Sequence, residues 1–354
     1  MVRCILFILL LMGVLSVSVS PPLAGEELSD EQIIARLQEQ RPEDRAIRRG
    51  LEWLREQQLE SGAVGDRSPT ALTSLAIMAH LAAGHAIHDP EHGEWLQRSL
   101  GYVLSQQEDN GYFGEADGSR MYGHGIALLM LAEALGMSDD PLLDESMRDA
   151  LTRAVAVSVN AAKIEKDERH QGGWRYHPHS DDSDLSLSGW HLMGLHAAQQ
   201  VGITVPEEVI QGAVDYARRL TSEDGEVAYN RPGGGDRPGI RGLGMLSFAI
   251  GKAEDDPLVD AIASRIRADP IEWRGRWLYY RIYYDAVGMA RSRPEIWQSY
   301  RSRLITMLVD EQDEAGFWPQ APSNNEGSHG KVYFTSMCIL ALAVDRYVLP
   351  SYQR

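Results

Sequence analysis

The sequence predicts an all-α fold, a single (α/α)6 toroid in which six outer helices surround six inner helices. Three observations predict it. A short glycine step recurs six times along the chain, each step follows an amphipathic segment, and each precedes a segment that is apolar on nearly every side. A helix without a polar face must be covered on all sides, so the apolar segments belong inside and the amphipathic segments outside.

The glycine step reads Gly-x-(Trp/Phe/Val), and its copies begin 41 to 61 residues apart. In three copies a glutamine stands four residues before the glycine, at Gln58, Gln107 and Gln312. Repeats of this period are units that bury their apolar faces only by stacking on one another. The six copies are Gly62–Val64, Gly111–Phe113, Gly172–Trp174, Gly225–Val227, Gly275–Trp277 and Gly316–Trp318.

The segments between the steps give the order of the predicted helices. Apolar residues recur at three- and four-residue spacing in the outer segments, as Ile47, Leu51 and Leu54 do. Outer helices are expected within residues 45–58, 95–107, 147–163, 208–221, 258–268 and 295–312. Inner helices are expected within residues 71–84, 125–136, 185–202, 239–251, 277–290 and 332–347.

Composition excludes several classes of function. The chain has 354 residues, is 44% hydrophobic and 24% charged, and carries a formal net charge of −17. It therefore has material for a sizeable core, and its average field repels a phosphate backbone or an anionic membrane surface. We expect no nucleic-acid partner, and the sequence does not specify the oligomeric state.

The first 25 residues read as a secretory signal peptide. Arg3 precedes an uncharged apolar run over residues 5–19, and Pro21, Pro22 and the small pair Ala24-Gly25 follow it. We expect a periplasmic or secreted protein, with an uncleaved anchor as the alternative. No later segment is apolar enough to suggest a membrane span. Residues 26–41 then form a linker or N-terminal arm, and residues 42–354 form the toroid domain.

Only one cysteine, Cys338, lies beyond the expected cleavage site, so the mature chain forms no internal disulfide. Loops with the spacing of nucleotide-binding or serine-hydrolase motifs are missing from the sequence. We expect no cofactor.

The glycine step resembles the repeat of the terpenoid cyclase and protein prenyltransferase superfamily, also known as the prenyltransferase/squalene oxidase repeat. The pattern Gln-xxx-Gly-x-(Trp/Phe) is best kept at residues 107–113 and 312–318, and the resemblance spans about residues 42 to 350. It implies one full squalene cyclase-like α/α-toroid.

Residues 172–186 resemble the squalene-hopene cyclase stretch in which Gly-Gly-Trp leads into Asp-x-Asp-Asp-Thr at the start of an inner helix. The resemblance implies that Asp184 is the catalytic proton donor and that Asp182 is its partner, whereas Leu185 stands at the third aspartate position. Burial and the charge of Asp182 would raise the pKa of an acid at this place. Two alternatives stay open: the aspartates cap the inner helix, or they belong to a structural or binding network.

Aromatic residues crowd the predicted inner helices. Ring faces stabilise cations and pack against apolar chains, although an aromatic stripe on a buried helix also serves as plain core. His124 begins an inner helix on the same side and is either a site residue or a helix-end packing residue. The candidate ligand-binding residues are His124, Trp190, Tyr280, Tyr284 and Tyr333.

We expect no metal site. Protein prenyltransferases hold zinc with an aspartate, a cysteine and a histidine, and Phe334 stands where their last-helix histidine would be. The loop histidines His170, His177 and His179 lack the spacing that is typical of metal ligands, so any metal binding there would be adventitious.

Three functions follow from these residues. The first is a binding module that holds a small apolar or isoprenoid-like ligand in the central cavity. The second is a cyclase-like isomerase that protonates a polyene. The third is a glycan hydrolase or lyase, for which the carboxylates of residues 181–184 and Glu326 would have to face each other across a cleft.

Overall fold

The computed structural model describes residues 41–346 and 348–349, so the predicted signal peptide and the arm up to residue 40 lie outside the described residues. The described part of the chain is all-helical, with twelve α-helices and two short 3-10 turns, which confirms the predicted fold class. The outer helices are α2 (Pro42–Glu56), α4 (Gly93–Ser105), α6 (Pro141–Ala162), α8 (Glu207–Arg219), α10 (Pro257–Ala268) and α12 (Pro294–Asp310). The inner helices are α3 (Pro69–Ala82), α5 (Arg120–Gly136), α7 (Leu185–Gln200), α9 (Arg241–Ile250), α11 (Leu278–Ser292) and α13 (Gly330–Leu342).

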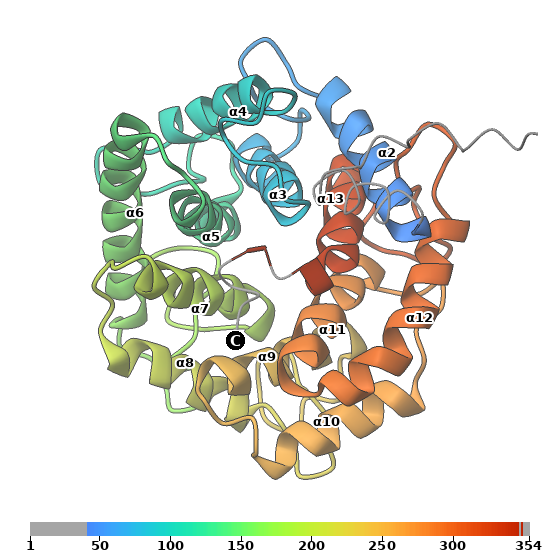
Figure 1. Cartoon of the computed structure of the whole chain (residues 1–354). Coiled ribbons are helices and arrows are strands. Elements are labelled where there is room, and N and C mark those ends of the chain that lie inside the picture. The colour runs from blue at the N-terminus through green and yellow to red at the C-terminus, as the bar shows by residue number, and fades with distance from the viewer. Residues whose placement is uncertain (1–40, 347, 350–354) are drawn as a thin grey trace, which may run out of the picture. The chain divides into compact units, whose positions relative to one another are not determined.

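The inner helices form a closed ring. Each inner helix packs against the next inner helix along the chain, and the last, α13, packs against the first, α3. The outer helices lie around this ring, as Figure 1 shows. Closure follows from the repeat, because each inner helix is apolar on all sides and needs a neighbour on both flanks. None of the described helices meets the length and hydropathy needed to cross a membrane.

Helix boundaries follow local sequence signals. Outer helix α2 begins on Pro42, whose fixed backbone angle suits the first turn, and buries Ile47, Leu51 and Leu54 on one face. The predicted inner helix over residues 239–251 is split, because a 3-10 turn η1 (Pro238–Ile240) precedes α9. The helix predicted to start at Trp277 starts one residue later, since Trp277 adopts a left-handed conformation with φ 56°.

The six loops that lead from an outer to an inner helix lie at one end of the ring, which we call the loop end. Neighbouring loops are hydrogen-bonded to one another there. The Asp117 carboxylate accepts from the Thr70 N–H (2.8 Å), and the Met121 N–H donates to the Tyr176 carbonyl (3.2 Å). Where the last loop meets the first, the Arg67 guanidinium donates to the Ser328 carbonyl (3.1 Å).

The glycine of the step is required by a close approach between neighbouring repeats. Gly172 has φ +82°, and a Cβ atom there would clash with the Gly212 carbonyl of outer helix α8. The same holds for Gly111 against Arg153 of α6 and for Gly316 against Arg49 of α2. Each of these steps rests on the backbone of the next outer helix around the ring. Gly275 is an exception, because nothing lies within 4 Å of its Cβ position.

The glutamine before the glycine fixes the same contact. The Gln107 side-chain amide donates to the Ala150 carbonyl of α6 (2.8 Å) and to the Gly111 carbonyl of its own step (3.1 Å). Gln312 makes the equivalent pair of bonds to Ala46 of α2 (2.8 Å) and to Gly316 (2.7 Å). Gln312 therefore joins the last repeat to the first.

Two glycines with the same left-handed backbone conformation let the stability cost of a steric clash be measured separately from the cost of the conformation itself. Gly172 and Gly202 have φ of 82° and 81°, but only Gly172 lies against a neighbouring backbone. We predict that Gly202→Ala lowers the free energy of unfolding by about 1–2 kcal/mol, the cost of a left-handed alanine. Gly172→Ala should lower it by a further ~2 kcal/mol or more. Urea denaturation of both variants checks this, and equal losses would contradict the close-approach explanation.

Candidate functional site

The carboxylates at the loop end bind helix N-termini. The Asp184 side chain is the N-cap of α7 and accepts from the Leu187 N–H (2.9 Å). Glu326, in the last loop, accepts from the N–H groups of Tyr279 (3.0 Å) and Tyr280 (3.2 Å) at the start of α11. These carboxylates satisfy donors that have no partner within their helix.

Asp184 also forms a buried ion pair. Its side chain is fully buried, the Ser186 hydroxyl donates to it (2.6 Å), and the Arg175 guanidinium donates to its second oxygen. A carboxylate with this many donors is tied into the structure, and a proton donor at this position would first have to leave its ion pair. The helix-cap alternative therefore describes the geometry of Asp184 in this structure.

Arg175 links the two candidate aspartates. Its guanidinium lies 3.1 Å from Asp182, pairs with Asp184, donates to the Tyr229 hydroxyl (3.0 Å) and stacks over the Tyr176 ring (4.3 Å). Burial lowers the pKa of Arg175, but the charge of Asp184 and the hydrogen bonds to Asp184 and Tyr229 together outweigh burial and raise this pKa above its ordinary value. The two aspartates differ, because the Asp182 side chain is 45% exposed whereas that of Asp184 is buried.

The aromatic residues of α7 and α11 pack on one another inside the ring. The Trp190 ring stacks on Tyr283 with centroids 5.6 Å apart, and its indole N–H donates to the Tyr280 hydroxyl (2.9 Å). Tyr284 lies beside Tyr280 at 5.2 Å. We call Trp190, Tyr280, Tyr283 and Tyr284 the aromatic cluster. Tyr280 is its most exposed member at 8%, so these rings fill core space in this structure.

The other two candidate ligand-binding residues lie on the inner helices α13 and α5, and Tyr333 shares the Oε1 atom of Glu326 with the N–H of Tyr280. The Tyr333 hydroxyl of α13 donates to Glu326 (3.0 Å). The Nδ1 atom of His124 accepts from the N–H of Phe113 (3.1 Å), the third residue of a glycine step, and Nε2 lies 3.1 Å from the Ala154 carbonyl of α6. His124 thus connects its step to an outer helix, and burial lowers its pKa to about 4.

The histidines of the third loop are engaged within the loop. His170 Nδ1 accepts from the Ser183 N–H (3.1 Å), and the rings of His177 and His179 stack with centroids 5.5 Å apart. Within residues 41–346, no three histidine, cysteine or acidic side chains are grouped so that they could hold a metal ion.

Trp277 is the exposed aromatic residue at the loop end. It is 42% exposed, lies immediately before α11, and its ring meets the edge of Tyr280 at a centroid distance of 6.3 Å. Sequence reasoning assigned Trp277 to a buried inner helix, and only its left-handed backbone places the indole at the surface. The Asn325 side chain accepts from the Trp277 N–H (2.9 Å) and so supports this conformation.

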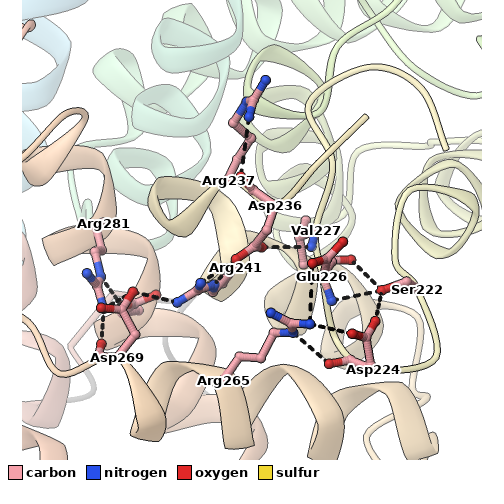
Figure 2. Close-up of polar contacts among 11 residues, drawn as sticks. Ser222, Asp224, Glu226, Val227, Asp236, Arg237, Arg241, Arg265, Asp269 and Arg281 are labelled. Atoms are coloured by element: carbon pink, nitrogen blue, oxygen red, sulfur yellow. Dashed lines mark hydrogen bonds and ion pairs between the residues drawn. The ribbon is translucent and has the colours of Figure 1, made fainter. Parts of the chain in front are cut away.

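A network of ion pairs joins α9, α10 and α11 next to Trp277. Arg241 pairs with Asp236 and with Asp269 (2.8 Å), and Arg281 also pairs with Asp269 (3.4 Å). Figure 2 shows these side chains converging while the Arg237 side chain extends away from them. The network pairs Asp236 and Asp269 with arginines of α9 and α11.

Comparison with solved structures shows what the fold is similar to. An inactive variant of the α-1,6-mannanase GH76A of Salegentibacter sp. HEL1_6, in complex with α-1,6-mannotriose, matches with a TM-score of 0.65 and 9% identity over 86% of this chain and 99% of that chain. The type II terpene cyclase MstE from Scytonema matches with a TM-score of 0.58 and 14% identity over 87% of this chain and 99% of that chain.

No sequence-family profile and no curated protein matches the chain. At 9% and 14% identity, the structural likeness establishes the α/α-toroid fold that mannanases and terpene cyclases share. It does not select between their activities.

Asp184 and Asp182 offer a matched pair of substitutions. We predict that Asp184→Asn lowers the free energy of unfolding by about 3 kcal/mol, because Arg175 loses its buried partner. Asp182→Asn should lower it by less than about 1 kcal/mol, because that carboxylate is half exposed. Chemical denaturation of both variants checks this, and an unchanged stability of Asp184→Asn would show that the ion pair contributes little.

His124 predicts a measurable pH dependence. Its pKa is about 4 in the folded chain against 6.5 for an ordinary histidine, so the unfolded chain binds more protons between these values. Its contribution to stability is complete above pH 6.5 and is lost as the pH falls toward 4. A glutamine can replace both ring hydrogen bonds without titrating. His124→Gln should therefore reduce the slope of unfolding free energy against pH near pH 5 by about 1.4 kcal/mol per unit. An unchanged slope would be inconsistent with a neutral, buried His124.

Proposed function

We propose that this toroid is a glycan-binding module that docks its ligand at the loop end and does not use Asp184 as a proton donor. The observation that carries the proposal is the pairing of Asp184 with Arg175 beneath a loop end that exposes Trp277. The residue matched to the cyclase acid is tied into the fold, whereas the exposed indole is available to a ligand.

Trp277 has the chemistry of a sugar platform. An indole held at the surface offers a flat apolar face together with a polar N–H, and the apolar face of a sugar ring stacks on such a surface. Tyr280 lies against its edge and makes the platform rigid. Rigid aromatic residues lose little conformational entropy on binding, which favours them as anchors.

The likeness to the mannanase supports this choice of ligand. That protein has the same toroid fold and was solved in complex with α-1,6-mannotriose. Hydrolysis of a glycan needs two carboxyl groups on either side of the scissile bond. Here Asp182 and Asp184 share Arg175, and Glu326 is fully buried with both oxygens bonded. The arrangement of these carboxylates favours binding without hydrolysis.

An isoprenoid-like ligand is the second candidate, and the aromatic cluster is the observation that favours it. From Trp277 the rings continue through Tyr280 to Trp190 in the interior, which is a path of aromatic faces from surface to core. The terpene cyclase likeness agrees with such a ligand. Binding there requires the packed rings to part, which a ligand resting on the surface does not require.

The place of action that we propose is outside the cytoplasm. An apolar run over residues 5–19 after Arg3 supports export to the periplasm or the medium. Glycans are abundant in those compartments, so the proposed location and the proposed ligand are consistent.

Binding and catalysis are separated by titrating the purified protein with mannotetraose, tetragalacturonate and geranylgeraniol, and by analysing each mixture by mass spectrometry. We predict saturable binding of an oligosaccharide with no cleaved product. Trp277→Ala should weaken that binding at least about tenfold, because a central aromatic anchor contributes about 2 kcal/mol.

Leu142→Ala is the control, because Leu142 is an exposed apolar residue (79%) in the first turn of outer helix α6, at the end of that helix opposite the loop end. It should leave binding unchanged. Cyclised product from the isoprenoid, or no saturable oligosaccharide binding at all, would overturn the proposed function.

A further inference from the structure

Two exposed arginines belong to segments that adjoin Trp277 at the loop end. Arg276 directly precedes Trp277 in the sequence, and Arg237 lies two residues before Gly239. A Cβ atom at Gly239 would lie 3.0 Å from the Cβ of Trp277, so the segment that carries Arg237 runs directly beside the tryptophan. Arg237, Arg276 and Trp277 form what we call the arginine–tryptophan patch.

Neither arginine of the patch is neutralised by a carboxylate in the described part of the chain. Arg237 donates only to the backbone carbonyl of Asp236 (3.3 Å), and Arg276 has no ion pair among residues 41–346. Carboxylates close to them in the sequence already have partners. Asp236 pairs with Arg241, and Glu272 pairs with Arg274 (2.6 Å).

The patch is cationic, whereas the chain as a whole is acidic. The protein carries a net charge of −17, yet within the described residues this sector presents two unpaired guanidinium groups to solvent while Asp236, Asp269 and Glu272 are held in ion pairs. Guanidinium groups bind carboxylates through paired hydrogen bonds, a geometry that lysine lacks. Exposed arginines beside an aromatic face fit a ligand with a negative group next to a flat apolar surface.

The backbone at Trp277 is left-handed, a conformation that costs a bulky residue on the order of 1–2 kcal/mol. The same conformation recurs where other inner helices begin, at Ser68, Arg120 and Gly330. At Trp277 the strained backbone presents a large ring to solvent rather than burying it. The conformation is therefore a feature of the repeat, and the exposed ring is what distinguishes Trp277.

We infer that the arginine–tryptophan patch binds an acidic oligosaccharide, with uronate carboxylates held by Arg237 and Arg276 and a sugar ring stacked on Trp277. This inference rests on the proposed glycan-binding function and names its ligand class. A glycan with regularly spaced carboxylates suits two arginines that neighbour one aromatic platform.

The test compares tetragalacturonate with neutral mannotetraose by titration calorimetry on the full chain. We predict that tetragalacturonate binds at least tenfold more tightly, and that its affinity falls as salt is raised because charges are screened. The double variant Arg237→Gln, Arg276→Gln should lose about 30-fold in affinity for tetragalacturonate and change little toward mannotetraose.

Arg267→Gln is the matched control, because Arg267 is an exposed arginine of outer helix α10 without an ion pair among the described residues. It should leave both affinities unchanged. Equal binding of both sugars with no effect of the double variant would overturn this inference and leave the glycan-binding function standing. Binding of neither sugar would overturn both. Binding of geranylgeranoic acid through the two arginines, without binding of tetragalacturonate, would assign the patch to a lipid acid and also overturn it.

Discussion

The contact between the step glycine and the next outer helix is the constraint on which the rest of the fold depends. At Gly172 the loop lies on the backbone of α8, and at Gly316 it lies on the backbone of α2, with no space for a side chain. Gln312 reinforces the second contact by bonding Ala46. Because every such contact joins one repeat to the next, the ring closes when the last repeat meets the first.

The glycine contact also explains a hydrogen bond that recurs in four of the repeats. Once the step is held against its neighbour, the N–H of its third residue points at the first turns of the following inner helix and needs an acceptor. Thr73, His124, Ser188 and Thr335 supply that acceptor in four repeats. His124 therefore has the same position as a hydroxyl residue in other repeats, which explains its burial and its neutral state. It also explains why a polar residue on an inner helix is not by itself evidence of a ligand site.

The fold could be predicted from the sequence because its signals are local. A glycine step, an amphipathic segment and an apolar segment can each be recognised within about twenty residues. Stacking of the repeats that contain them then determines the ring. The cap role of Asp184 was readable in the same way, as an aspartate directly before an apolar helix. Its pairing with Arg175 was not, since no spacing rule joins residues nine positions apart across a loop.

The surface of the loop end also could not be predicted from the sequence. Trp277 belongs to an aromatic segment whose pattern indicates burial, and its exposure depends on one left-handed residue supported by Asn325 from another loop. The role of Glu326 depends in the same way on a contact between the last loop and the start of α11. Such contacts are set by the closed ring, and for that reason they appear only when the tertiary structure is known.

The interaction that most separates a binding module from a cyclase is the ion pair between Arg175 and Asp184. A double-mutant cycle with Arg175→Gln and Asp184→Asn measures its coupling free energy by chemical denaturation. A stabilising coupling of about 2 kcal/mol is predicted for a buried pair whose members hold each other in place. A coupling free energy near zero would contradict the role of Asp184 as a structural ion-pair partner, because Asp184 would then be free of Arg175 and available as an acid.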